Sequence, residues 1–122
     1  MAQDLFTITD IQPQEGELRA TVKIHPEHPI FAGHFPGAPV TPGVMQLEMV
    51  KALLRQHFQN EIETRTIRTC KFLEVLDPRV NAEMSLVVKY KGSEMLDVTA
   101  TGHHQEKTFF KLQATFQPAR NL

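Results

Sequence analysis

The sequence of 122 residues has a single cysteine, no long apolar run and no block of basic residues. One cysteine, Cys70, excludes an intrachain disulfide and suits a reducing compartment. No stretch approaches the roughly 20 apolar residues that a membrane-spanning helix needs. The first residues have neither the basic start nor the apolar run of a signal peptide. These features predict a soluble, cytoplasmic protein with no membrane partner.

The charge balance argues against nucleic acid as a partner. The formal net charge is −1, so no basic surface is available to displace counterions from phosphates. Hydrophobic residues make up 41% of the chain and charged residues 22%, a composition typical of a folded globular protein. A chain of this length has room for one domain with a real core, so residues 1–122 are predicted to form a single domain.

Apolar and polar residues alternate through most of the chain, which predicts antiparallel β-strands. The clearest alternation covers residues 17–24, 82–90 and 110–116. A further strand of the same alternation is predicted near residues 96–100, and two more strands near residues 5–11 and 65–76. Glycine, proline and polar residues predict turns at residues 13–16, 91–93 and 102–107, the last of which contains His103 and His104.

One segment reads as a long helix, from Val44 to Leu54. Thr41 precedes a proline and is therefore disfavoured in the α region, which suits an N-cap residue. Pro42 can occupy the first helical position, where its missing N–H costs nothing. Apolar residues cover nearly every side of the helix, so it is predicted to be buried all round. One enclosed helix and five to seven antiparallel strands predict an α+β fold, with a sheet curled around the helix.

The segment from His34 to Glu48 carries the chemistry. Residues 33–48 read GHFPGAPVTPGVMQLE. The imidazole of His34, with an ordinary pKa of about 6.5, suits proton abstraction near neutral pH. Glu48, predicted to be buried in the helix, suits proton donation. The free N–H groups of the helix N-terminus can stabilise a developing negative oxygen, and Gly43 leaves room for a substrate carbonyl. This combination suits chemistry alpha and beta to a carbonyl.

The same segment resembles the active-site signature of the 3-hydroxyacyl-acyl carrier protein dehydratases of bacterial fatty acid synthesis, the β-hydroxyacyl dehydratase family. That signature is approximately GHFPGxPxxPGVxxxE, and every fixed position is filled here. The resemblance implies a hotdog fold, with His34 and Glu48 as catalytic residues and the backbone N–H of Gly43 as donor to the thioester carbonyl. It also implies a substrate-binding role for three neighbouring residues, Phe35, Pro42 and Val44.

The resemblance further implies a reaction and a set of partners. His34 would remove a proton from C2 of a (3R)-hydroxyacyl group carried by acyl carrier protein. Glu48 would protonate the departing C3 hydroxyl, leaving a trans-2-enoyl thioester. His34 of one chain would face Glu48 of its partner in a homodimer, which could assemble further. Neither a cofactor nor a metal is implied.

Some residues depart from the family pattern. Ala52 stands where the family usually has a glutamine, and Lys51 adds a cation beside Glu48. The sequence Cys70-Lys71-Phe72 only weakly resembles the strand that follows the helix in this family. Two alternatives therefore stay open: a non-catalytic subunit of a heterodimer that binds acyl carrier protein, and a hotdog acyl thioesterase. Instead of acting in catalysis, Glu48 could also be a structural partner of Lys51 or Arg55 on one side of the helix.

Other polar residues suggest simpler roles. His25 and His28 have a spacing that could hold a metal, but no third ligand is suitably spaced. Cys70 is expected to be a small core residue rather than a nucleophile. A basic strip could meet an acidic carrier protein or merely face solvent: Arg65, Arg68 and Lys71.

Overall fold

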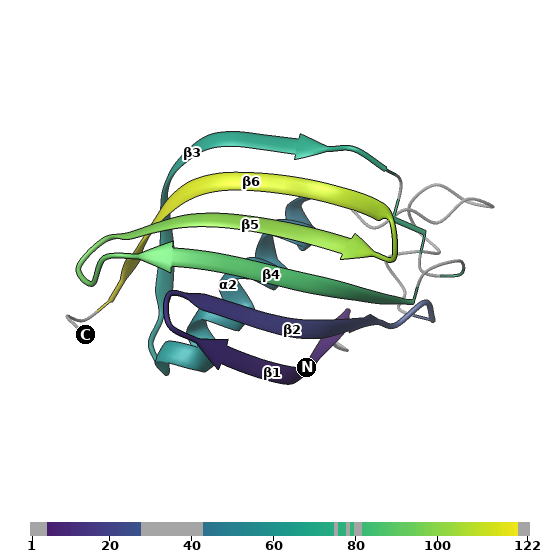
Figure 1. The fold of residues 1–122 in the computed structure, drawn as a ribbon, viewed down its shortest axis with the longest axis horizontal. Helices are drawn as coiled ribbons and strands as arrows, with labels where there is room; N and C mark the ends of the chain where they lie inside the picture. The colour runs from purple at the N-terminus through teal and green to yellow at the C-terminus, as the bar shows by residue number, and fades with distance from the viewer. Residues whose placement is uncertain (1–4, 28–42, 75, 78, 80–81, 120–122) are drawn as a thin grey trace.

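The computed structural model describes residues 5–27, 43–74, 76–77, 79 and 82–119. Within these ranges, six strands and one helix follow one another in the order β1 (Phe6–Gln14), β2 (Glu17–Ile24), α2 (Gly43–Phe58), β3 (Ile62–Phe72), β4 (Glu83–Lys91), β5 (Leu96–His104) and β6 (Lys107–Pro118). The strands form one sheet in the order β1-β2-β4-β5-β6-β3, and all neighbours are antiparallel (Figure 1). Among the described residues, β1 and β3 are the edge strands of this sheet.

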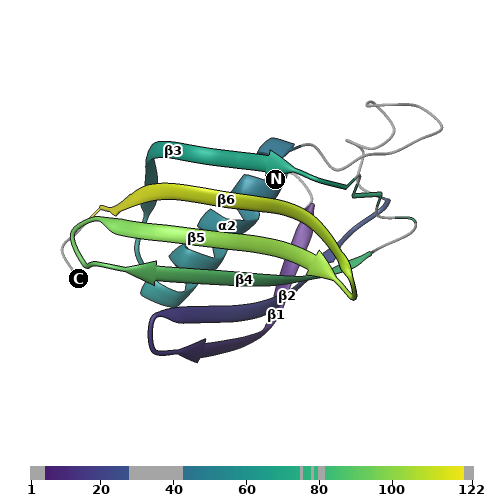
Figure 2. The same ribbon diagram turned by 45° about the horizontal axis from the view of Figure 1, so that its top comes forward.

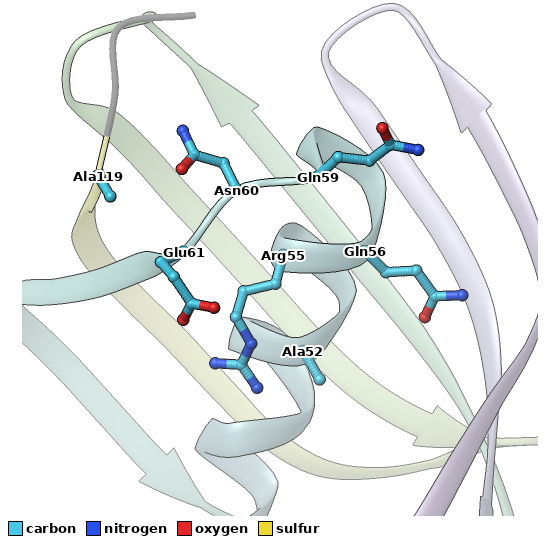
Figure 3. Close-up of a pocket in the computed structure, with 7 residues that line it drawn as sticks. All are labelled: Ala52, Arg55, Gln56, Gln59, Asn60, Glu61 and Ala119. Carbon is cyan, nitrogen blue, oxygen red and sulfur yellow. The ribbon is translucent and has the colours of Figure 1, made fainter.

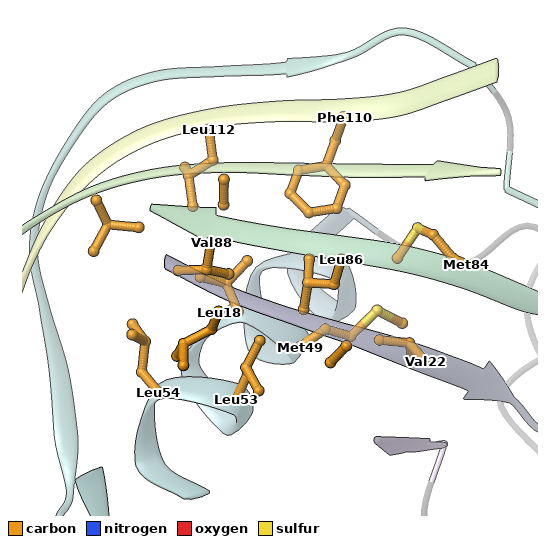
Figure 4. Packing of buried hydrophobic residues seen from close by; sticks show 14 of the residues in the cluster. Leu18, Val22, Met49, Leu53, Leu54, Met84, Leu86, Val88, Phe110 and Leu112 are labelled. Atoms are coloured by element: carbon orange, nitrogen blue, oxygen red, sulfur yellow. The ribbon is translucent and has the colours of Figure 1, made fainter. Parts of the chain in front are cut away.

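The sheet curls around α2, which crosses one of its faces (Figures 1 and 2). Alternate side chains of the strands point toward the helix and form the core with it (Figure 4). Leu18, Leu86 and Leu112, from three different strands, are at most 1% exposed. This arrangement confirms the predicted α+β fold. The alternation of apolar and polar residues matches it, because α2 covers one face of the sheet.

Two strand boundaries differ from the predictions. β3 begins at Ile62, three residues before the predicted start, and ends at Phe72. β5 continues to its last residue, His104, so the placement of His103 and His104 in a turn is wrong. Both histidines pair with residues of β6, and the two-residue turn that follows has Gln105 in a left-handed conformation, with a φ of 54°. The ladder can extend this far because that turn needs only two residues.

The helix α2 is confirmed and runs four residues further than predicted, to Phe58. Its end is closed by Gln59, which has a φ of 52°, and by the N–H of Asn60, which donates to the carbonyl of Arg55 at 3.3 Å. This is the hydrogen bond of a Schellman motif. The predicted N-cap and first helical residue, Thr41 and Pro42, lie outside the described residues.

Helix α2 is buried on one side only, so the prediction of burial all round is wrong. Met49, Val50, Leu53 and Leu54 face the sheet and are fully buried. The opposite side, here named the open face of α2, is half-buried or exposed and consists of Glu48, Lys51, Ala52, Arg55 and Gln56. The single sheet covers only one side of the helix, and the polar residues gather where its cover stops.

Candidate active site

Glu48 lies on the open face of α2, in the second turn of the helix. Its side chain is 37% exposed, so the prediction of a buried carboxylate is wrong for this chain by itself. The cause is the one-sided cover of the helix, since no strand of the described residues packs over this face. A carboxylate in this position can be reached by a substrate or by a second protein chain.

Glu48 forms an ion pair with Arg55. The Nη2 atom of Arg55 donates to Oε1 of Glu48 at 2.5 Å. Residues seven positions apart differ by only about 20° around a helix, so both side chains lie on the same stripe. Of the two pairings considered from the sequence, the structure contains the one with Arg55.

The helix N-terminus is packed more tightly than the sequence suggested. A Cβ atom added to Gly43 would lie 2.6 Å from Cζ of Phe72, so glycine is required unless the ring moves. Phe72 is the last residue of β3, and half of it remains exposed. The room expected beside Gly43 is therefore partly taken by this ring. In the sequence, Phe72 was noted only because Cys70-Lys71-Phe72 weakly resembles a strand of the family. That resemblance did not indicate the contact between Phe72 and Gly43.

The structure brings two of the predicted site residues together on one element. Gly43 begins α2, and Glu48 follows in the next turn. His34, Phe35 and Pro42 lie outside the described residues, and the side chain of Val44 does as well. The pairing of His34 with Glu48 thus stays a prediction.

A hollow of about 700 Å³ lies beside the C-terminal half of α2 (Figure 3). Five of its seven lining residues are polar or charged, and the full lining consists of Ala52, Arg55, Gln56, Gln59, Asn60, Glu61 and Ala119. It begins one turn after Glu48, and Arg55 belongs to both the hollow and the ion pair. Sequence reasoning missed this hollow because its walls come from the helix, the segment that joins it to β3 and the residue after β6.

His25 and Cys70, two further candidates among the described residues, have ordinary structural surroundings. Within the described ranges, no group of three metal-ligating side chains is found, and no helix is long and apolar enough to cross a membrane. His25 accepts or donates a hydrogen bond with Thr7 Oγ1 at 2.7 Å, whereas His28 lies outside those ranges. Burial raises the pKa of the Cys70 thiol, which disfavours the nucleophilic thiolate.

The residues of the basic strip differ in whether a neighbouring side chain balances their positive charge. Arg68 donates hydrogen bonds to Asp97 and to Thr115, so its charge is already matched. Lys71, in contrast, lies directly opposite Lys111 on β6, and both are exposed. Like charges in such a cross-strand pair repel one another.

The antiparallel sheet wrapped around α2 defines a hotdog-fold protein. The same fold is found in the ApeI:P dehydratase heterocomplex from Xenorhabdus doucetiae, with a TM-score of 0.72 and 20% identity over 92% of this chain and 97% of that one. The PaaI protein of the E. coli phenylacetic acid degradation operon has a TM-score of 0.63 and 13% identity, covering 92% and 80% of the two chains. A putative thioesterase from Ralstonia eutropha JMP134 has a TM-score of 0.64 and 16% identity, covering 92% and 83%.

The family is shown by sequence. The model of the ApeI-like family, described as ApeI dehydratase, matches residues 10–112, and the chain belongs to this family. No curated protein sequence matches the chain. The match spans the whole segment from His34 to Glu48 and extends into β6.

Proposed function

We propose that this protein dehydrates (3R)-hydroxyacyl groups carried by acyl carrier protein, producing trans-2-enoyl thioesters and water. One observation carries the proposal: the last residue of the GHFPG-to-Glu segment, Glu48, presents a half-exposed carboxylate on the open face of α2. Membership of a dehydratase family supports the reaction type.

The proposed chemistry needs a base, an acid and a hydrogen-bond donor. His34 takes a proton from C2, and the negative charge that develops on the thioester oxygen is stabilised by the N–H of Gly43. The C2–C3 double bond forms as the C3–O bond breaks, and Glu48 gives its proton to the leaving hydroxyl, which departs as water. Side chains and backbone supply all of these groups, so the proposal includes no cofactor or metal.

The proposal includes a homodimer in which each active site combines His34 of one chain with Glu48 of the other. The free edge of β3 supports this, because an exposed edge strand of 11 residues is a ready surface for another chain. Ile67 and Phe72, which point to the same side of the sheet as α2, are 46% and 50% exposed. An apolar edge of this kind is suited to burial in a complex.

The like-charged pair of Lys71 and Lys111 supports an acidic partner. Two exposed lysines directly opposite one another destabilise the sheet by a small amount, which a bound anionic surface would reverse. Acyl carrier protein, the partner that the family resemblance implies, is acidic and fits that requirement.

The direct test is dehydration of 3-hydroxybutyryl- and 3-hydroxydecanoyl-carrier protein, followed by ultraviolet absorbance of the conjugated enoyl thioester. His34→Ala and Glu48→Gln are each expected to lower kcat by about 100- to 10,000-fold, the usual contribution of a general acid or base. Both variants should keep the melting temperature of the wild type to within a few degrees.

The same reaction mixtures distinguish the alternatives. Release of free thiol without enoyl product would indicate a thioesterase. A folded wild type that binds the carrier but yields neither product would indicate a non-catalytic subunit of a heterodimer, and the proposal would be wrong.

A further inference from the structure

We infer that Arg55 is a positioning residue for Glu48 in the proposed dehydration, on which this inference rests. Arg55 lies two turns further along α2, at a rise of roughly 10 Å, and its side chain reaches back to place Nη2 2.5 Å from Oε1 of Glu48. The contact holds the carboxylate in one orientation on the open face.

The ion pair leaves one carboxylate oxygen for chemistry. Among the described residues, the hydrogen bond to Glu48 engages Oε1. In the ion pair Glu48 is ionised, and the proposed step needs its protonated form. Because Oε1 accepts from Arg55 in either form, that proton is carried on Oε2, the oxygen that delivers it to the leaving hydroxyl. Arg55 thereby determines which oxygen faces the substrate without touching the substrate itself.

Partial burial of the arginine separates this pair from the other ion pairs of the described residues. The side chain of Arg55 is 29% exposed, whereas the arginines of the other ion pairs are 46–53% exposed. Less solvent competes for the Arg55 contact, and a half-buried arginine loses less freedom when it holds a carboxylate.

Ala52 lies between the two charged residues on the open face of α2. Its methyl group leaves space for the side chain of Arg55 to run beside the helix, and Figure 3 shows Arg55 extending from its own turn toward the turn of Ala52. Both residues line the hollow of about 700 Å³, which opens to solvent. Removal of the Arg55 side chain would therefore leave a space that a small cation can enter.

This open space permits a chemical-rescue experiment. Arg55→Ala is expected to lower kcat by about 10- to 100-fold with KM changed less than about twofold, because a misplaced group costs rate rather than binding. Millimolar guanidinium should restore several-fold of that kcat in Arg55→Ala. The same concentration should not raise kcat in the wild type or in the double variant Arg55→Ala/Glu48→Gln. Arg55→Lys keeps the positive charge but lacks the planar guanidinium group, so its kcat should lie between those of the wild type and Arg55→Ala.

Arg19→Ala is the matched control. Arg19 also donates to a carboxylate at 2.5 Å, that of Glu17, but on β2 at the far face of the sheet. It should leave kcat and KM unchanged. Melting temperatures of all variants, measured in parallel, show that a loss of rate is not a loss of fold.

The outcomes separate the inference from the proposed function. An active wild type with an equally active Arg55→Ala would overturn the positioning role alone. A loss of kcat that guanidinium does not restore would also overturn it, since a structural role predicts that result. A wild type without dehydration would overturn both the proposed function and the role of Arg55.

Discussion

Gly43 and Phe72 meet at the N-terminus of α2, although they belong to different elements. A Cβ on Gly43 would lie 2.6 Å from Cζ of Phe72, well inside the normal contact distance of about 3.5–4.0 Å between carbon atoms. Alanine is normally favoured over glycine in a helix by about 0.5–1 kcal/mol. Here the contact opposes that gain, so Gly43→Ala is expected to leave the free energy of unfolding unchanged or to lower it.

The contact is tested by combining Gly43→Ala with Phe72→Ala. Once the ring is absent, Gly43→Ala should raise the free energy of unfolding relative to Phe72→Ala alone, by at most the roughly 0.5–1 kcal/mol that applies in a helix interior, because Gly43 is the first residue of α2. Urea unfolding of the wild type, both single variants and the double variant measures the difference. The same effect of Gly43→Ala with and without the ring would show that the two residues do not interact.

At the scale of elements, β3 is joined to the rest of the sheet by a side chain as well as by its pairing with β6. Arg68 of β3 reaches across β6 to Asp97 of β5 and on its way contacts Thr115 Oγ1 at 3.4 Å. The hydrogen bond and the charge of Arg68 hold the pKa of Asp97 below its usual value, with a smaller contribution from Lys91. The pair is exposed, so its effect on stability is small, but it has a distinct pH dependence.

Arg68→Ala is therefore expected to destabilise the protein in a pH-dependent manner. The folded-state pKa of Asp97 is lowered, so the stabilisation is complete above the unfolded pKa of about 3.9 and is lost as the pH falls through the folded-state value. The difference in melting temperature between wild type and Arg68→Ala should be constant from about pH 7 to pH 5 and shrink below about pH 4. In an Asp97→Asn background, Arg68→Ala should have no such pH dependence. A difference that grows on acidification would contradict this assignment.

The strands could be predicted from the sequence because the sheet has one buried face. Alternation of the kind seen in Leu18, Ala20 and Val22 directly reflects that one-sided burial. The ends of β3 and β5 could not be predicted, since they depend on pairing partners and on a two-residue turn that the local pattern does not specify. The open face of α2 was missed for a related reason: the abundance of apolar residues does not tell how far the sheet extends around the helix.

Some residues of the candidate site could be predicted from the sequence, and others could not. Glu48, Gly43 and the possible partner Arg55 could be found because they follow one another on a single helix at fixed spacing. Phe72 and the hollow beside Gln59 depend on contacts between elements that are distant in the sequence, which periodicity cannot show. The exposure of Glu48 could not be predicted from the local sequence either, because it depends on which other elements cover α2.

At the scale of the whole molecule, the described chain leaves the proposed acid uncovered. The contact of Gly43 with Phe72 places the end of β3 beside the start of α2, so a free sheet edge and the helix that carries Glu48 lie close together. A second copy that binds at this edge would approach the open face of α2. The proposed homodimer therefore predicts a site whose base and acid belong to different chains.

Mixing two inactive variants tests this prediction. The His34→Ala chain keeps Glu48, and the Glu48→Gln chain keeps His34, so a mixed dimer would contain one complete site and one site that lacks both groups. After equimolar subunit exchange about half of the dimers are mixed, and dehydration should return to roughly a quarter of the wild-type rate. Sedimentation verifies that dimers are present, and native mass spectrometry with a mass tag on one of the two variants verifies that the subunits exchange. If exchange is complete and no activity returns, then His34 and Glu48 act within one chain, and the shared site is wrong even though the dehydratase proposal stands.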